Sequence, residues 1–175
     1  MIYILLKNKF KKIVKYIDGF DYNNINYLDS LALSVILSNA IGYDNLRFVR
    51  WLHRKNINCF YDHSMNTASM YGHLNIVKWL HHNRSEGCTF NAMDYAASYN
   101  HLDVVKWLHS NRTEGCTTSA MDWATYYGDL DVVEWLHKNR TEGCTIDAVY
   151  NTLDNISENR NKDHTKRYEC IFFIK

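Results

Sequence analysis

The chain has 175 residues, 46% of them hydrophobic, and its 20 basic side chains nearly balance 19 acidic ones. This length and apolar content allow one domain or a short repeat array with a sizeable core. The lack of proline, the 7 glycines and the aromatic fraction of 14% exclude collagen-like, proline-rich and linker-type chains and argue against general disorder. A formal net charge of +1 gives no reason to expect a protein that binds nucleic acid or a membrane surface.

No targeting segment is recognisable near the N-terminus. Only five consecutive apolar residues, Ile2 to Leu6, precede Lys7, whereas a secretory signal needs about 7–15. No later stretch approaches the roughly 20 apolar residues of a membrane span. We therefore expect an intracellular, cytoplasmic protein with reduced thiols and no membrane partner.

Two apolar segments come first in the chain. The segment "FKKIVKYI", residues 10–17, predicts one amphipathic helix, and we expect residues 1–28 to form an N-terminal capping helix and its connection. Residues 31–41 are strongly apolar and predict the first helix of an end repeat that packs on it.

From residue 40 onward the chain repeats with a period of 28 residues. Four kinds of residue share this period: Ala40, Ala68, Ala96 and Ala124; Leu46, Leu74, Leu102 and Leu130; Val49, Val77, Val105 and Val133; and Trp51, Trp79, Trp107 and Trp135, each followed by Leu-His. Self-similarity at about 20–50 residues indicates a solenoid or an array. The two most similar units read "NAMDYAASYNHLDVVKWLHSNRTEGCTF" and "SAMDWATYYGDLDVVEWLHKNRTEGCTI".

Each unit predicts two short helices joined by a turn. The first helix should begin at a residue that caps helices, carry an acid in its first turn and end at a residue that tolerates the left-handed conformation. The caps are Asn91, Ser119 and Asp147, the acids Asp94 and Asp122, and the ends Gly72, Asn100 and Gly128. The second helix carries an apolar stripe in which the four Trp residues are predicted to lie in the core. One such hairpin cannot bury both of its faces, so the units must stack.

These units resemble the ankyrin repeat, whose family pattern is T-P-L-H-x-A-A-x-x-G-H-x-x-V-V-x-L-L. Its Thr is matched by Asn91 and Ser119, its Pro by Ala92 and Ala120, its His by Asp94 and Asp122, and its Gly-His by Gly72-His73. The sequence motif "WLHxNRTEGCT" is similar to the divergent, short ankyrin repeats of giant viruses of amoebae. The resemblance implies an all-α, ankyrin-type solenoid of helical hairpins, although other two-helix solenoids remain an alternative.

The resemblance covers residues 29–153, with about four repeats. We place them at about 29–61, 62–89, 90–117 and 118–145, followed by a half-repeat at 146–153. The family unit has about 33 residues, so a period of 28 predicts shortened loops between repeats. Residues 154–175 predict a charged, partly disordered tail that supplies no second helix. Because an uncapped repeat face tends to associate, this end could mediate oligomerisation.

Cysteine and histidine also recur with the period. Equivalent positions in stacked helices lie about 8–10 Å apart, too far for a disulfide, which needs Cα atoms about 4.4–6.8 Å apart, or for two thiolates about 2.3 Å from one zinc. We therefore interpret Cys88, Cys116 and Cys144 as structural thiols, and expect no metal and no cofactor. The chain lacks phosphate-binding loops and hydrolase or metalloprotease motifs, so we predict no catalytic residues and no enzyme.

Function is then expected at a surface. The resemblance implies that the first helices form a concave face that binds a protein partner, a host protein in a host cytoplasm if the chain is viral. The candidate contact residues are Met70, Tyr71, Phe90, Ser98, Tyr99, Thr118, Tyr126 and Tyr127. Tyr71, Tyr99 and Tyr127 would form a ladder of anchors, a role for which Tyr is enriched.

Three alternatives stay open at this point. The tyrosines could only shield neighbouring helices. The periodic Cys and His could belong to a metal- or redox-responsive protein. The chain could also be a truncated member of an expanded repeat family with little independent function.

Overall fold

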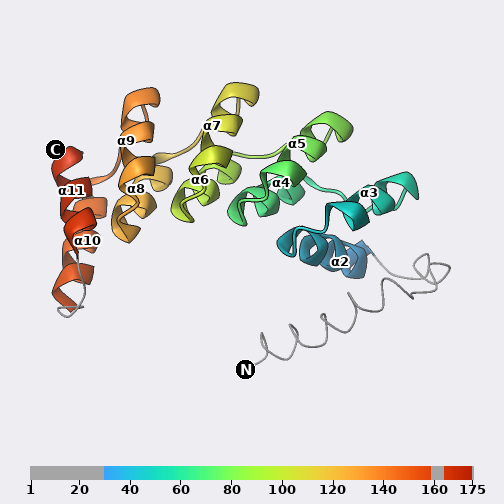
Figure 1. Cartoon of the computed structure of the whole chain (residues 1–175), viewed down its shortest axis with the longest axis horizontal. Coiled ribbons are helices and arrows are strands. Elements are labelled where there is room, and N and C mark those ends of the chain that lie inside the picture. The colour runs from blue at the N-terminus through green and yellow to red at the C-terminus, as the bar shows by residue number, and fades with distance from the viewer. Residues whose placement is uncertain (1–29, 159–163, 175) are drawn as a thin grey trace.

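The protein is described by a computed structural model that covers residues 30–158 and 164–174. Within these ranges the chain forms ten α-helices and no strand, arranged as a row of helical hairpins (Figure 1). The helices are α2 (Ser30–Gly42), α3 (Leu46–Arg54), α4 (Asp62–Met70), α5 (Leu74–Asn83), α6 (Asn91–Ser98), α7 (Leu102–Asn111), α8 (Thr118–Tyr127), α9 (Leu130–Asn139), α10 (Ile146–Glu158) and α11 (Thr165–Phe173). The all-α solenoid is thereby confirmed.

In the hairpins α4–α5, α6–α7 and α8–α9 the turn ends the first helix with a left-handed residue. The backbone φ angle is 71° at Gly72, 60° at Asn100 and 82° at Gly128, as the sequence predicted. The following amide then reaches back over the helix end, as in the 2.8 Å hydrogen bond from His101 N to Ala96 O. This helix-ending geometry satisfies a carbonyl that has no partner within the helix and fixes the direction of the second helix.

The core lies between the two layers of helices. The residues that α7 contributes to the core are Val104, Val105 and Leu108, all at most 1% exposed. The first helices contribute the recurring alanines, whose small side chains let neighbouring helices approach closely. The four predicted core tryptophans pack against this core but stay partly exposed at its edge: Trp51, Trp79, Trp107 and Trp135.

The array is curved because its two layers pack differently. Neighbouring first helices, α4, α6, α8 and α10, pack closely against one another in sequence, whereas the second helices α5 and α7 make few contacts with each other. The row therefore bends toward the first helices, and we call their exposed side the inner face (Figure 1). In the described part of the chain the loops at 84–90, 112–117 and 140–145 contain no strand, which agrees with the predicted shortened loops.

The C-terminal end differs from the expected disordered tail. The first helix of the last hairpin, α10, continues to Glu158. The second helix of this hairpin is α11, which packs on α9 of the preceding repeat. Cys170 and Ile171 are buried against this neighbour, at 0% and 6% exposure. In α11 the charged Lys166, Arg167 and Glu169 precede the apolar run Cys170 to Phe173, so the sequence reads as a charged tail with an apolar end, and the packing on α9 reveals the helix.

The predicted helix at residues 10–17 lies outside the described residues. No helix in the ranges 30–158 and 164–174 is long and apolar enough to cross a membrane.

Candidate functional site

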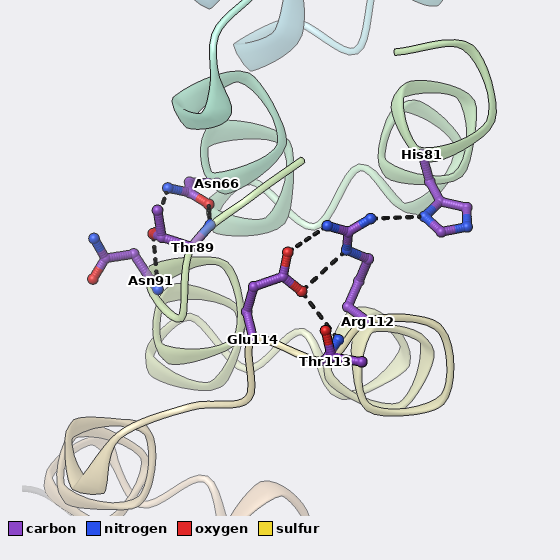
Figure 2. A network of polar contacts seen from close by, with 7 residues as sticks. All are labelled: Asn66, His81, Thr89, Asn91, Arg112, Thr113 and Glu114. Carbon is purple, nitrogen blue, oxygen red and sulfur yellow. Dashed lines mark hydrogen bonds and ion pairs between the residues drawn. The ribbon is translucent and has the colours of Figure 1, made fainter. Parts of the chain in front are cut away.

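Successive repeats are joined on their inner side by a polar contact that recurs three times. The carboxylate of Asp94 accepts hydrogen bonds from the backbone N and the Oγ1 of Thr117, at 2.8 and 2.6 Å. Asp122 and Thr145 repeat both bonds at 2.7 and 2.8 Å. Asn66 makes the equivalent pair with Thr89: its Oδ1 accepts from Thr89 N at 3.1 Å and its Nδ2 donates to Thr89 Oγ1 at 2.9 Å (Figure 2).

These contacts correct the predicted helix caps. Asn91 and Ser119 do not cap α6 and α8. Instead Thr89 Oγ1 accepts from Asn91 N at 3.3 Å, and Thr117 Oγ1 accepts from Ser119 N at 3.1 Å. The helices begin where they do because a side chain of the preceding repeat holds the threonine in place. Asp94 therefore joins two repeats, a role beyond the interaction with the dipole of its own helix that the sequence predicts.

A further series of contacts, which we call the His81 ladder, joins the second helices of neighbouring repeats through histidine, arginine and tryptophan side chains. Arg112 pairs with Glu114 in its own loop and reaches back to His81 of the preceding repeat, with 3.3 Å between Nη1 and Nδ1 (Figure 2). The ring of His81 meets Trp107 edge-on, 5.2 Å between centroids. Arg140, His109 and Trp135 make the same contacts one repeat later. At the end of the array the ring of His137 meets Phe173 instead of a tryptophan, with 5.2 Å between centroids.

Burial controls the ionisation of this ladder. It lowers the pKa of His81, and the neighbouring Arg112 lowers it further. The hydrogen bond from Arg140 lowers the pKa of Glu142, although burial opposes it. The outer surface thus holds paired ions and, at His81, a side chain whose protonation is disfavoured.

The cysteines are all thiols without a disulfide. Burial raises the pKa of Cys88 and of Cys116 to about 11, so both stay protonated near neutral pH. Thiolate is the form that binds metal and reacts. No group of three or more His, Cys, Asp or Glu suited to a metal occurs in the described part of the chain.

The inner face is hollowed between α6 and α8 by a groove of about 570 Å³. Four of the predicted contact residues line it: Phe90, Ser98, Tyr99 and Tyr127. Tyr99 is 57% exposed and Tyr127 50%. We call this hollow the aromatic groove.

The other predicted contact residues lie elsewhere. Thr118 and Tyr126 line a second groove, of about 580 Å³, between α8 and α10. Met70 and Tyr71 lie one repeat earlier and line neither groove; the exposed Tyr71 ring stacks on His73, 6.0 Å between centroids. Of the three tyrosines at the period of 28, Tyr99 and Tyr127 therefore share the aromatic groove, and Tyr71 lines neither groove.

Two aromatic residues of the groove were missed by the sequence analysis. Tyr95 and Trp123 line it and are 40% and 48% exposed. They occupy one register of the repeat, four residues before Tyr99 and Tyr127, and residues four apart share a helix face. This spacing of four residues in the sequence could have identified Tyr95 and Trp123 as neighbours of Tyr99 and Tyr127.

Comparison with protein families agrees with this architecture. The family model described as "Ankyrin repeats (many copies)" matches residues 65–109 and 93–137. No curated protein matches the sequence. The described part of the chain is thus an all-α helical solenoid, and its residues 65–137 are similar to ankyrin repeats.

Proposed function

We propose that this protein binds a protein partner, without catalysis, through its inner face. Ankyrin repeats are generally non-catalytic protein–protein interaction modules. The observation that carries the proposal is the collection of five exposed aromatic side chains in a single groove: Phe90, Tyr95, Tyr99, Trp123 and Tyr127. Large aromatic side chains dominate the energetics of protein interfaces.

Several of these rings are held in place before any partner arrives. Trp123 stacks on Tyr127, with centroids 6.0 Å apart and an angle of 24° between the planes. Tyr126 meets both rings edge-on, at 5.6 and 5.1 Å, and its hydroxyl accepts a hydrogen bond from Asn155 at 2.8 Å. Preorganised aromatic surface loses little conformational entropy on binding.

The exposed fractions favour binding over simple shielding of helices. A tyrosine that only covered its neighbour would lie largely buried, whereas more than half of Tyr99 faces solvent. The Cys residues offer less support for a metal- or redox-responsive protein, because burial raises the pKa of Cys88 and so disfavours the thiolate that would bind metal or react.

A photo-crosslinking amino acid at Ser98 tests the proposal in the native cell. Ser98 is a small residue of the aromatic groove, and Ser110, on the outer helix α7, is the matched control. We expect a discrete crosslinked protein from position 98 that is lost in the Tyr99→Ala variant and is absent from position 110. The same crosslinks at both positions, or none from position 98 in a folded protein, would contradict the proposal.

A further inference from the structure

The inner face differs in charge from the rest of the molecule. The segments 61–71, 89–99, 117–127 and 145–158, which form α4, α6, α8 and α10 with their leading residues, contain no Lys or Arg. They do contain acids, namely Asp62, Asp94, Asp122, Asp147, Asp154 and Glu158. The near-zero net charge of the chain therefore conceals a negative inner face and basic residues on the second helices and loops.

The acids lie beside the aromatic groove. The groove between α8 and α10, which we call the acidic groove, is lined by Asp122, Asp147, Asp154 and Glu158. Trp123 and Ser119 line both grooves, so the indole of Trp123 stands on the ridge that separates them. In the fold, α6, α8 and α10 are consecutive helices of the inner layer (Figure 1).

This arrangement is complementary to a positively charged side chain on a long apolar stem. A guanidinium or ammonium group is attracted to the face of an indole more than to other aromatic rings. Arg also stacks on planar rings and pairs with carboxylates. Its aliphatic stem would cover apolar surface while its charge reaches the acids.

Among the described residues, a basic side chain close to the end of α8 does not occupy this place. Arg167 of α11 donates from Nε to the carbonyl of Tyr126 at 2.8 Å, at the end of α8, and its Nη1 lies 2.9 Å from His164 Nδ1. It lines neither groove.

We infer that the partner of this protein presents a basic, arginine-containing extended segment that crosses the ridge at Trp123. One Arg side chain lies over the indole and points toward Asp154 and Glu158, while neighbouring residues fill the aromatic groove. This inference rests on the proposed function and names the chemistry of the partner.

Binding of defined peptides tests the inference. The probe is a fluorescein-labelled 12-residue peptide of alternating Arg and Ser, compared with the same peptide carrying citrulline, which has the shape of Arg without its charge, or Glu. We expect the Arg peptide to bind about tenfold more tightly than the citrulline peptide, and the Glu peptide not to bind. Raising NaCl from 0.1 to 1 M should weaken binding, since the screening length falls from about 10 to about 3 Å.

Variants locate the site. Trp123→Leu and Asp154→Asn/Glu158→Gln should each reduce the affinity for the Arg peptide about five- to tenfold. Asp131→Asn, at an exposed acid at the start of α9, removes one negative charge away from the grooves and should leave the affinity unchanged. The carboxylate variants keep the test meaningful if Trp123→Leu fails to fold. Equal binding of the Arg and citrulline peptides, or equal loss in the Asp131→Asn variant, would overturn the inference.

Competition separates this inference from the proposed function. Excess Arg peptide should abolish the crosslink from position 98 to the native partner. A crosslinked partner that the Arg peptide does not displace would leave the proposed function standing and would refute a basic segment. The loss of both crosslink and peptide binding would refute both.

Discussion

Asp94 of α6 holds Thr117 at the start of the next repeat through two hydrogen bonds, 2.8 Å to its backbone N and 2.6 Å to its hydroxyl. The same threonine then caps α8 by accepting from Ser119 N. One side chain thus joins two repeats and positions the helix that carries Trp123. Binding surface and stability depend on the same contact.

Replacing this carboxylate with a methyl group should destabilise the array. Asp94→Ala leaves the amide and the hydroxyl of Thr117 without their partner, and we expect a loss of about 1–3 kcal/mol in the free energy of unfolding. Chemical denaturation monitored by circular dichroism measures it.

The register supplies its own control for this variant. Asn66 makes the equivalent contacts with Thr89 one repeat earlier. Asp94→Asn should therefore remain within about 1 kcal/mol of the wild type. Burial raises the pKa of Asp94, so its ionised form is disfavoured in the folded protein. The free energy of unfolding of Asp94→Asn, relative to that of the wild type, should therefore be higher at pH 7 than at pH 3. Equal destabilisation by Ala and Asn would contradict this account of the contact.

The C-terminal helix should behave as a structural cap. Ile171 is 6% exposed against the last repeat, whereas the adjacent Phe172 is 83% exposed. Ile171→Ala should reduce the free energy of unfolding by about 2 kcal/mol or more, and Phe172→Ala by no more than about 0.5 kcal/mol. Thermal melts of both variants give the comparison, and a larger effect at Phe172 would argue against the observed packing of α11.

Loosening this cap should also promote self-association, as expected for an exposed repeat face. Size-exclusion chromatography with light scattering should show a concentration-dependent increase in mass for Ile171→Ala that exceeds that of the wild type. A monomer at all concentrations in both proteins would remove the case for oligomerisation through this end.

The His81 ladder should make stability depend on pH. Because burial and Arg112 lower the folded-state pKa of His81 below its ordinary 6.5, protonation is less favourable in the folded protein than in the unfolded one. Its contribution is complete above about pH 6.5 and is lost as the pH falls through the folded-state pKa.

His81→Gln tests this dependence. Glutamine stays neutral and can still accept from Arg112, so the decrease in melting temperature between pH 7.5 and 5.5 should be smaller than in the wild type. The control Ser110→Gln changes an exposed residue of α7 that does not titrate and should keep the wild-type slope. Identical slopes in all three proteins would show that His81 is not responsible.

One buried hydroxyl offers a route to a more stable protein. Thr125 of α8 is fully buried, and its Oγ1 has no hydrogen-bond partner within the described residues. Thr125→Val keeps the shape and removes the unsatisfied group, so we expect a gain of about 1 kcal/mol. Unchanged or lower stability in denaturant titrations would contradict this expectation, with Thr125→Ala as a variant that also loses the methyl group.

The period of 28 predicted much of the fold because it reports local properties. Gly72, Asn100 and Gly128 mark the helix ends by their tolerance of left-handed backbone, and the Val and Leu of the second helices mark a buried face. Both signals come from residues close together in the chain. They suffice for hairpins that must stack.

The aromatic groove could be predicted only in part, because it depends on two helices and not on one. The sequence indicated Phe90, Ser98, Tyr99 and Tyr127, which meet in one groove, but it also grouped Tyr71 with them and omitted Tyr95 and Trp123. Which aromatic residues share a hollow depends on how α6 and α8 are placed side by side. No spacing within one helix contains that information.

Composition and periodicity therefore establish an all-α repeat array, the hairpin turns and the shortened loops. The tertiary structure decides the contacts that join residues 23 or 31 positions apart: Asp94 with Thr117 and Arg112 with His81. It also decides that α11 completes the last hairpin and that negative and aromatic side chains gather on one face. These features depend on the relative placement of stacked repeats, which long-range packing sets and a one-dimensional pattern does not describe.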